Sequence, residues 1–90
     1  MELLPENEHE REVDRLLARF AQPNRCLLDL GCGAGFTLCR LAPQLSAIWG
    51  FEQEARLLEA ARQRVASLRL SNTTLILGNV ALAGDVAQLP

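Results

Sequence analysis

The chain has 90 residues, of which 49% are hydrophobic and 22% charged, a composition typical of one small folded domain. Nine basic residues against eleven acidic ones give a net charge of −2, so nothing in the charge favours binding to nucleic acid or to an anionic membrane. No apolar run approaches the roughly 20 residues that cross a bilayer, and residues 1–5 do not begin a secretory signal. We therefore expect a cytoplasmic protein.

Several reactions are excluded because residue types that they need are missing or isolated. The chain has no lysine and no tyrosine, and His9 is its one histidine. Without lysine it cannot form a Schiff base or the phosphate-binding loop that ends in Gly-Lys-Ser/Thr. A serine–histidine–acid triad would need His9, which lies among the charged residues 6–15 and is expected on a solvated helix face.

The three cysteines predict neither a metal site nor a disulfide framework. Cys26, Cys32 and Cys39 are odd in number and separated by five and six intervening residues, unlike the paired ligands of zinc sites. We interpret them as small packing residues in a reducing compartment.

The first predicted element is an amphipathic helix within residues 1–23. Asn7 can cap its start, acidic residues are frequent in its first turns, and Pro23 is expected to stop it. The apolar face that repeats with helical spacing consists of Val13, Leu16, Leu17 and Phe20.

Residues 24–79 predict an alternation of strands and helices. Residues 25–30 form a nearly continuous apolar run, which indicates a strand covered on both faces, and residues 36–42 predict a short helix that ends at Pro43. A second buried strand is expected at 46–51, the clearest helix at 54–69, and a third strand at 75–77, introduced by residues 72–74. The order strand–helix–strand–helix–strand predicts an α/β domain with a parallel sheet. Residues 80–90 form a tail with one turn signal, at Gly84-Asp85.

Three glycines at every second position follow the first predicted strand: Gly31, Gly33 and Gly35. Glycine has no Cβ, so it accepts a positive φ and leaves room for a ligand against the backbone. A tight turn at this point predicts a site for a nucleotide-type cofactor.

A polar side chain stands at or near the end of each predicted strand. Asp29 precedes the glycines, Glu52 follows the second strand, and Asn79 follows the third. Since the carboxyl ends of parallel strands share one edge, and ligands bind in the crevice there, we expect these three residues and the glycines to form one site.

These residues resemble the class I S-adenosylmethionine-dependent methyltransferases. The family motif apolar-Asp-apolar-Gly-x-Gly-x-Gly matches Leu28–Gly35 at every fixed position, and Glu52 and Asn79 occupy the places of two further cofactor ligands. The resemblance extends from about Val13 to the end of the chain. It implies a Rossmann-like three-layer sandwich, here truncated to an N-terminal helix plus β-α-β-α-β, with the strands in the order 3-2-1.

The resemblance also implies a role for each residue. Glu52 would accept both ribose hydroxyls of the cofactor, Asp29 would meet the cationic amino group of the methionine part, and Asn79 would meet the adenine amino group. The Val80 amide would serve a ring nitrogen, and Gln53 is a further candidate for a contact with the adenine. Backbone contacts with the cofactor would come from Gly31, Cys32, Gly33 and Gly35.

Two alternatives remain at this cofactor site. A dinucleotide fingerprint would read G-x-G-x-x-G, but Phe36 stands where its last glycine belongs, which favours S-adenosylmethionine over NAD or FAD. Residues 84–90 also look like the family's Gly-Asp-Ala-x-x-Leu-Pro passage, and in that alignment Asp85 would replace Asn79 at the adenine. The spacing from Glu52 favours Asn79.

The chain departs from the family in length, because complete members have about seven strands. The second half holds the substrate-orienting residues, so neither a methyl acceptor nor a catalytic residue is predicted. Two functions follow: the cofactor half of a methyltransferase that needs the missing half for turnover, or a non-catalytic interaction module with a vestigial site. Truncation would also leave the first strand as a bare apolar edge, which predicts a homodimer or a contact with a partner chain.

Overall fold

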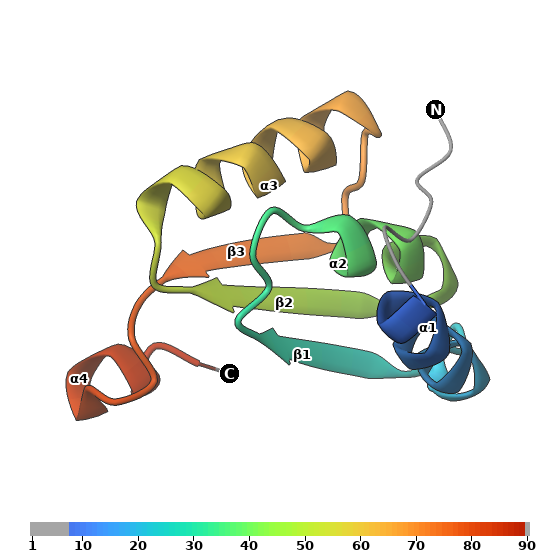
Figure 1. Ribbon diagram of the computed structural model, residues 1–90, viewed down its shortest axis with the longest axis horizontal. Coiled ribbons are helices and arrows are strands. Elements are labelled where there is room, and N and C mark those ends of the chain that lie inside the picture. Colours follow the sequence, from blue (N-terminus) through green and yellow to red (C-terminus); the bar gives the residue numbers. More distant parts are fainter. Residues whose placement is uncertain (1–7, 90) are drawn as a thin grey trace.

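The computed structural model describes residues 8–89, and the predicted alternation of elements is confirmed (Figure 1). The cap expected at Asn7 lies outside the described residues. The elements are α1 (Glu8–Phe20), β1 (Cys26–Leu30), α2 (Phe36–Leu41), the 3₁₀ helix η1 (Ala42–Gln44), β2 (Ala47–Glu52), α3 (Ala55–Ser67), β3 (Thr73–Leu77) and α4 (Ala83–Val86).

The sheet is parallel, with β2 in the centre between β1 and β3. This is the predicted 3-2-1 order. In the register of the strands, Asp29 lies opposite Gly50, and Gly50 lies opposite Leu75. All three strands point the same way in Figure 1, so their carboxyl ends and the loops that follow them meet at one edge.

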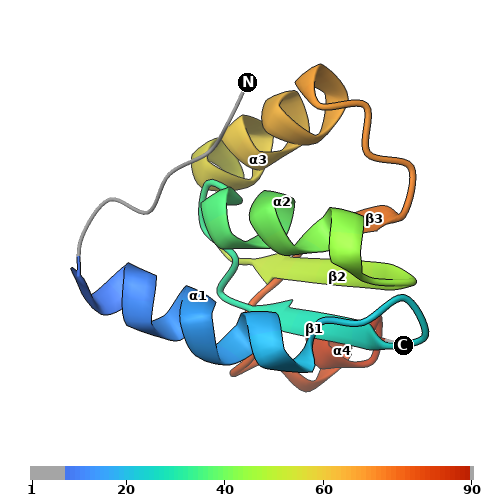
Figure 2. The same cartoon turned by 90° about the vertical axis from the view of Figure 1, so that its right-hand side faces the viewer.

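The hydrophobic core lies on one face of the sheet, beneath α1, α2 and α3 (Figure 2). Ile48 on β2 and Leu38 on α2 are fully buried at its centre, and Leu58 on α3 closes it. On the sheet side, every second residue of a strand faces this core. On the helix side, the apolar residues that recur with helical spacing face it. None of the helices within residues 8–89 has the length and apolar character needed to cross a bilayer.

The opposite face of β1 is open, so the prediction of a strand covered on both faces is wrong. Cys26, Leu28 and Leu30 are exposed, Leu30 by 55%, while Leu27 and Asp29 on the other face are partly buried. Alternate side chains of a strand point to opposite faces, and among the described residues α1, α2 and α3 all cover the same one. The packing role expected of the cysteines therefore holds for Cys32 and Cys39 but not for Cys26.

Three local boundaries differ slightly from the prediction. Helix α1 ends at Phe20, before Pro23, where the Arg25 guanidinium donates to the Phe20 carbonyl oxygen at 3.1 Å. Pro43 does not end the helical conformation directly after α2. It lies within the 3₁₀ turn η1, near its first residue, where the N–H that proline lacks is not needed. The Gly84-Asp85 turn signal lies within α4, a single helical turn.

Candidate cofactor site at the carboxyl edge of the sheet

The three glycines of the turn all adopt a positive φ, with values of 75° at Gly31, 57° at Gly33 and 85° at Gly35. Other residues would be strained in this left-handed region. The chain thereby leaves β1, reverses, and enters α2 within five residues, with Gly35 as the N-cap.

The turn is attached to the end of β2 by three hydrogen bonds. The Phe51 carbonyl oxygen accepts from the Gly31 N–H at 2.6 Å and from the Cys32 N–H at 3.2 Å. The Glu52 carboxylate accepts from the Gly33 N–H, with 2.9 Å between Oε1 and N. The strand pairing of β1 with β2 thus continues into the turn and fixes its position.

Glu52 is a buried carboxylate, with only 8% of its surface exposed. Its second oxygen, Oε2, accepts from the Glu54 N–H at 2.9 Å. Charge-assisted hydrogen bonds to both oxygens hold the carboxylate in one orientation. Each oxygen keeps a further lone pair, so the group can still accept hydrogen bonds from a ligand.

Asp29 lies near Glu52 and is partly buried on the helix-covered face of β1. Burial raises the pKa of Asp29, and the negative charge of Glu52 raises this pKa further. Two carboxylates in a partly desolvated position repel each other. A cationic group bound between them would relieve that repulsion.

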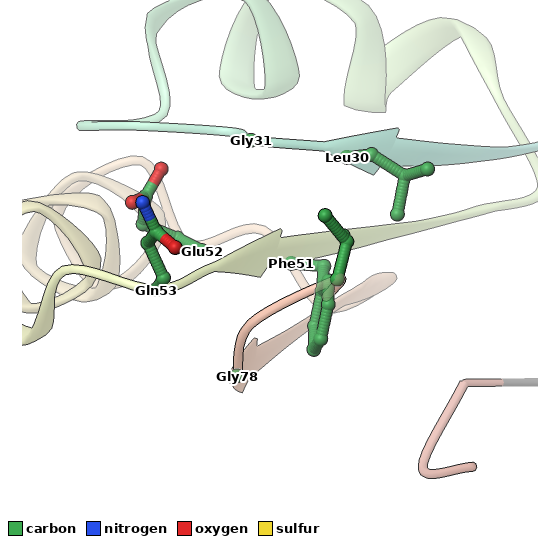
Figure 3. Close-up of a pocket in the computed structure, with 7 residues that line it drawn as sticks. Leu30, Gly31, Phe51, Glu52, Gln53 and Gly78 are labelled. Atoms are coloured by element: carbon green, nitrogen blue, oxygen red, sulfur yellow. The ribbon is translucent and has the colours of Figure 1, made fainter. Parts of the chain in front are cut away.

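A pocket of about 330 Å³ opens beside these residues. Figure 3 shows Glu52 and Gln53 at one end and Leu30 and Phe51 at the other. An apolar wall with a few fixed polar groups is typical of small-molecule sites. The lining consists of Leu30, Gly31, Phe51, Glu52, Gln53, Gly78 and Val80.

A second hollow follows the end of β3 and contains both predicted adenine ligands, Asn79 and Asp85. The Asn79 N–H donates to Asp85 Oδ2 at 2.8 Å, and the Asn79 side-chain oxygen accepts from the Ala81 N–H at 2.9 Å. Gln53 and Gly78 line this hollow as well as the first, so the two hollows adjoin at the strand ends.

The predicted site residues fall into two groups. The first hollow brings together Gly31, Glu52, Gln53 and Val80, and the second adds Asn79. The other four line neither hollow: Cys32 and Gly35 are buried, and Asp29 and Gly33 are partly buried. Burial also raises the pKa of the Cys32 thiol to about 11, so it stays protonated at neutral pH.

Sequence reasoning missed Phe51, Leu30 and Gly78 as lining residues. Only 1% of the surface of Phe51 is exposed, yet this residue forms part of the pocket wall. The sequence signal for the place of Phe51 is the alternation of side chains along a strand: residues 49 and 51 face the side of the sheet opposite to Ile48 and Glu52. Among the side chains that the structure describes, no group of three metal-ligating residues comes together.

Comparisons with known proteins agree with this arrangement. A family model described as a methyltransferase domain matches residues 21–88. A protein-L-isoaspartate O-methyltransferase of Saccharophagus degradans is 34% identical over 64 residues, which are 71% of this chain and 28% of that protein.

Solved structures share the fold at lower identity. An rRNA methylase from Streptococcus thermophilus superimposes with a TM-score of 0.75 at 22% identity, over 84% of this chain and 46% of that one. Phosphoethanolamine N-methyltransferase 1 of Haemonchus contortus, solved with phosphoethanolamine and S-adenosylhomocysteine, gives a TM-score of 0.65 at 21% identity, over 74% and 14% of the two chains. The chain spans less than a third of the length of the curated relatives that it matches.

The methyltransferase-domain model covers more than half of the chain, and the glycine turn, the acidic residue that ends β2 and the parallel sheet lie within the matched residues. The chain therefore belongs to the methyltransferase domain family.

Proposed function

We propose that the two hollows at the carboxyl edge of the sheet bind S-adenosylmethionine and its product S-adenosylhomocysteine. The observation that carries this proposal is the buried Glu52 carboxylate, held by two backbone N–H groups where the glycine turn meets the pocket. A carboxylate fixed in this way is suited to accept two hydrogen bonds from the cis-diol of a ribose.

The methionine part of the cofactor lies, in this proposal, against the glycine turn. The Asp29 carboxylate meets the ammonium group. Burial and, after it, the negative charge of Glu52 raise the pKa of Asp29, and a bound cation would offset both effects, which supports this role. Backbone atoms of Gly31, Cys32, Gly33 and Gly35 contact the cofactor. No metal is needed for any of these contacts.

The adenine lies where the two hollows meet at Gln53 and Gly78, with Gln53 beside the ring and the Val80 N–H, from the first hollow, donating to a ring nitrogen. Asn79 and Asp85 are the two alternative partners for the adenine amino group. Both keep acceptor capacity after the hydrogen bonds described above, and the spacing from Glu52 favours Asn79. A larger loss of affinity in Asp85→Ala than in Asn79→Ala would reverse this order.

We propose methyl transfer as the reaction in which this chain takes part, at a cytoplasmic location. The chain supplies the site of the methyl donor, and turnover requires that a second half of the domain supplies the site of the acceptor. The relatives named above act on acceptors of different classes, so the acceptor stays unassigned. In-line transfer from a sulfonium depends mainly on proximity and orientation, so this chain alone is expected to be inactive.

Isothermal titration with S-adenosylhomocysteine and with its 2′-deoxy analogue tests the role of Glu52. We expect the analogue to bind about tenfold more weakly, because a buried carboxylate loses one hydrogen bond. In Glu52→Ala the two ligands should bind equally, while Glu59→Ala, on the exposed side of α3, should retain the difference. Equal binding of both ligands to the parent protein would refute the ribose assignment.

The alternative function is an interaction module with a vestigial site. It is favoured if neither S-adenosylmethionine nor S-adenosylhomocysteine gives heat at millimolar concentration. A homodimer or partner contact at the β1 edge is compatible with both functions, and exposed Leu28 and Leu30 support it. Sedimentation velocity that finds only monomer at high protein concentration would count against a homodimer.

A further inference from the structure

Arg64, on α3, also contacts the glycine turn. Its Nη1 donates to the Ala34 carbonyl oxygen at 2.8 Å, although 30 residues separate the two. The guanidinium carbon lies 3.7 Å from the centre of the Phe36 ring. Ala34 and Phe36 flank Gly35, so Arg64 contacts the turn on both sides of its last glycine.

The same helix makes a second contact with the turn. A Cβ built on Gly35 would lie 2.9 Å from the Cβ of Ala61, so the two backbones approach closely. Ala61 and Arg64 are three residues apart and therefore share one face of α3. Figure 1 shows the loop between β1 and α2 rising toward α3, as these contacts require.

The middle of the turn is thus held by two side chains of opposite charge. Glu52, from β2, accepts from the Gly33 N–H, and Arg64, from α3, donates to the carbonyl oxygen of the next residue, Ala34. These bonds fix neighbouring peptide groups, and the Gly35 N–H adds a bond to the Cys32 carbonyl at 3.1 Å. A turn fixed in this way presents its backbone to a ligand without first having to be ordered.

We propose that Arg64 is a positioning residue for the cofactor site. Its hydrogen bond to the Ala34 carbonyl oxygen orients the Ala34–Gly35 peptide and thereby keeps the turn in its binding conformation. This inference rests on the proposed function for its effect on affinity. The planar guanidinium is needed because one group must both donate to a carbonyl and stack on a ring, which an ammonium does poorly.

The test compares Arg64→Met, Arg64→Lys and the control Arg62→Ala. Arg62 lies on the same helix and forms only an exposed ion pair with Glu59 at 3.9 Å. We expect the dissociation constant for S-adenosylhomocysteine to rise about tenfold in Arg64→Met, less in Arg64→Lys, and to stay unchanged in Arg62→Ala.

Amide hydrogen exchange separates positioning from general destabilisation. In Arg64→Met the amides of residues 33–36 should exchange faster, while those of β2 around Ile48 keep their parental rates. Uniformly faster exchange over the whole sheet would mean that Arg64 only stabilises the fold. Parental exchange and parental affinity in Arg64→Met would overturn the proposal.

The exchange measurement also keeps the two proposals distinguishable. If the parent protein does not bind the cofactor, the proposed function fails, and faster exchange confined to residues 33–36 still supports the positioning of the turn by Arg64. If the parent binds, and Arg64→Met shows parental affinity and parental exchange at residues 33–36, the positioning role fails and the proposed function stands.

Discussion

The two ends of one glycine turn need glycine for different reasons. Gly31 and Gly35 share a positive φ, at 75° and 85°, but a Cβ on Gly31 would meet nothing within 4 Å, whereas one on Gly35 would lie 2.9 Å from the Ala61 Cβ. At Gly31 the glycine keeps the wall of the pocket bare, and at Gly35 it lets the turn pack against α3. Affinity and stability should therefore respond separately to changes at the two ends.

The largest expected effect is the loss of stability in Gly35→Ala. The left-handed backbone is strained by about 1–2 kcal/mol for any residue with a Cβ, and overpacking against Ala61 adds about 1–3 kcal/mol. A chain of this size has only about 5–15 kcal/mol to lose. Urea unfolding of Gly35→Ala should report this loss, and Ala61→Gly in the same chain should recover part of it. Strictly additive effects of the two substitutions would show that no clash occurs.

Gly31→Ala should have the opposite balance. The unfolding free energy should fall by only about 1–2 kcal/mol, from backbone strain alone. The added methyl group faces the pocket that Gly31 lines, so the dissociation constant for S-adenosylhomocysteine should rise by about tenfold or more. Calorimetric titration beside urea unfolding measures both. Unchanged affinity in a folded variant would place the cofactor elsewhere.

Asp29→Asn should raise the free energy of unfolding and lower the affinity for the cofactor. Stability and affinity are therefore expected to respond separately at Asp29 too, two residues before Gly31. The folded state raises the pKa of Asp29 above its ordinary value of 3.8, so the folded state binds the proton more tightly than the unfolded one. The stability of the parent consequently falls as the pH rises from about 3.8 through the raised pKa. At pH 7 the variant should melt at a higher temperature than the parent, and below about pH 4 the difference should vanish. A lower melting temperature for the variant at pH 7 would mean that the Asp29 carboxylate forms a stabilising contact.

Gly84→Ala should have the smallest effect and serves as the baseline for the glycine turn. Gly84 lies in α4 without a positive φ, and a Cβ there would meet nothing within 4 Å. Alanine should stabilise the chain by up to about 1 kcal/mol, because it restricts the unfolded chain and favours the helix. Thermal unfolding measures this change. If Gly84→Ala lost as much unfolding free energy as Gly35→Ala, neither the sign of φ nor the packing around the Cβ would explain which glycines can be replaced by alanine.

The order of the elements and the position of the turn could be predicted because their signals are local. Glycines at 31, 33 and 35 and the apolar stripe of α3 are visible within a few residues of sequence. The open face of β1 could not be predicted, because an apolar strand has the same sequence whether one face is covered or both. The contact of Arg64 with Ala34 spans 30 residues, so it depends on how α3 packs and leaves no local pattern.

The Phe51 carbonyl, which accepts from both Gly31 and Cys32, makes formation of the site part of sheet folding. The N–H groups of Gly31 and Cys32 continue the hydrogen bonding between β1 and β2. The turn therefore cannot open unless the end of this strand pair also separates. A bound cofactor would therefore stabilise the pairing of an edge strand that has one neighbour in the sheet. Protection of the Gly31 and Cys32 amides should thus report strand pairing and ligand binding together.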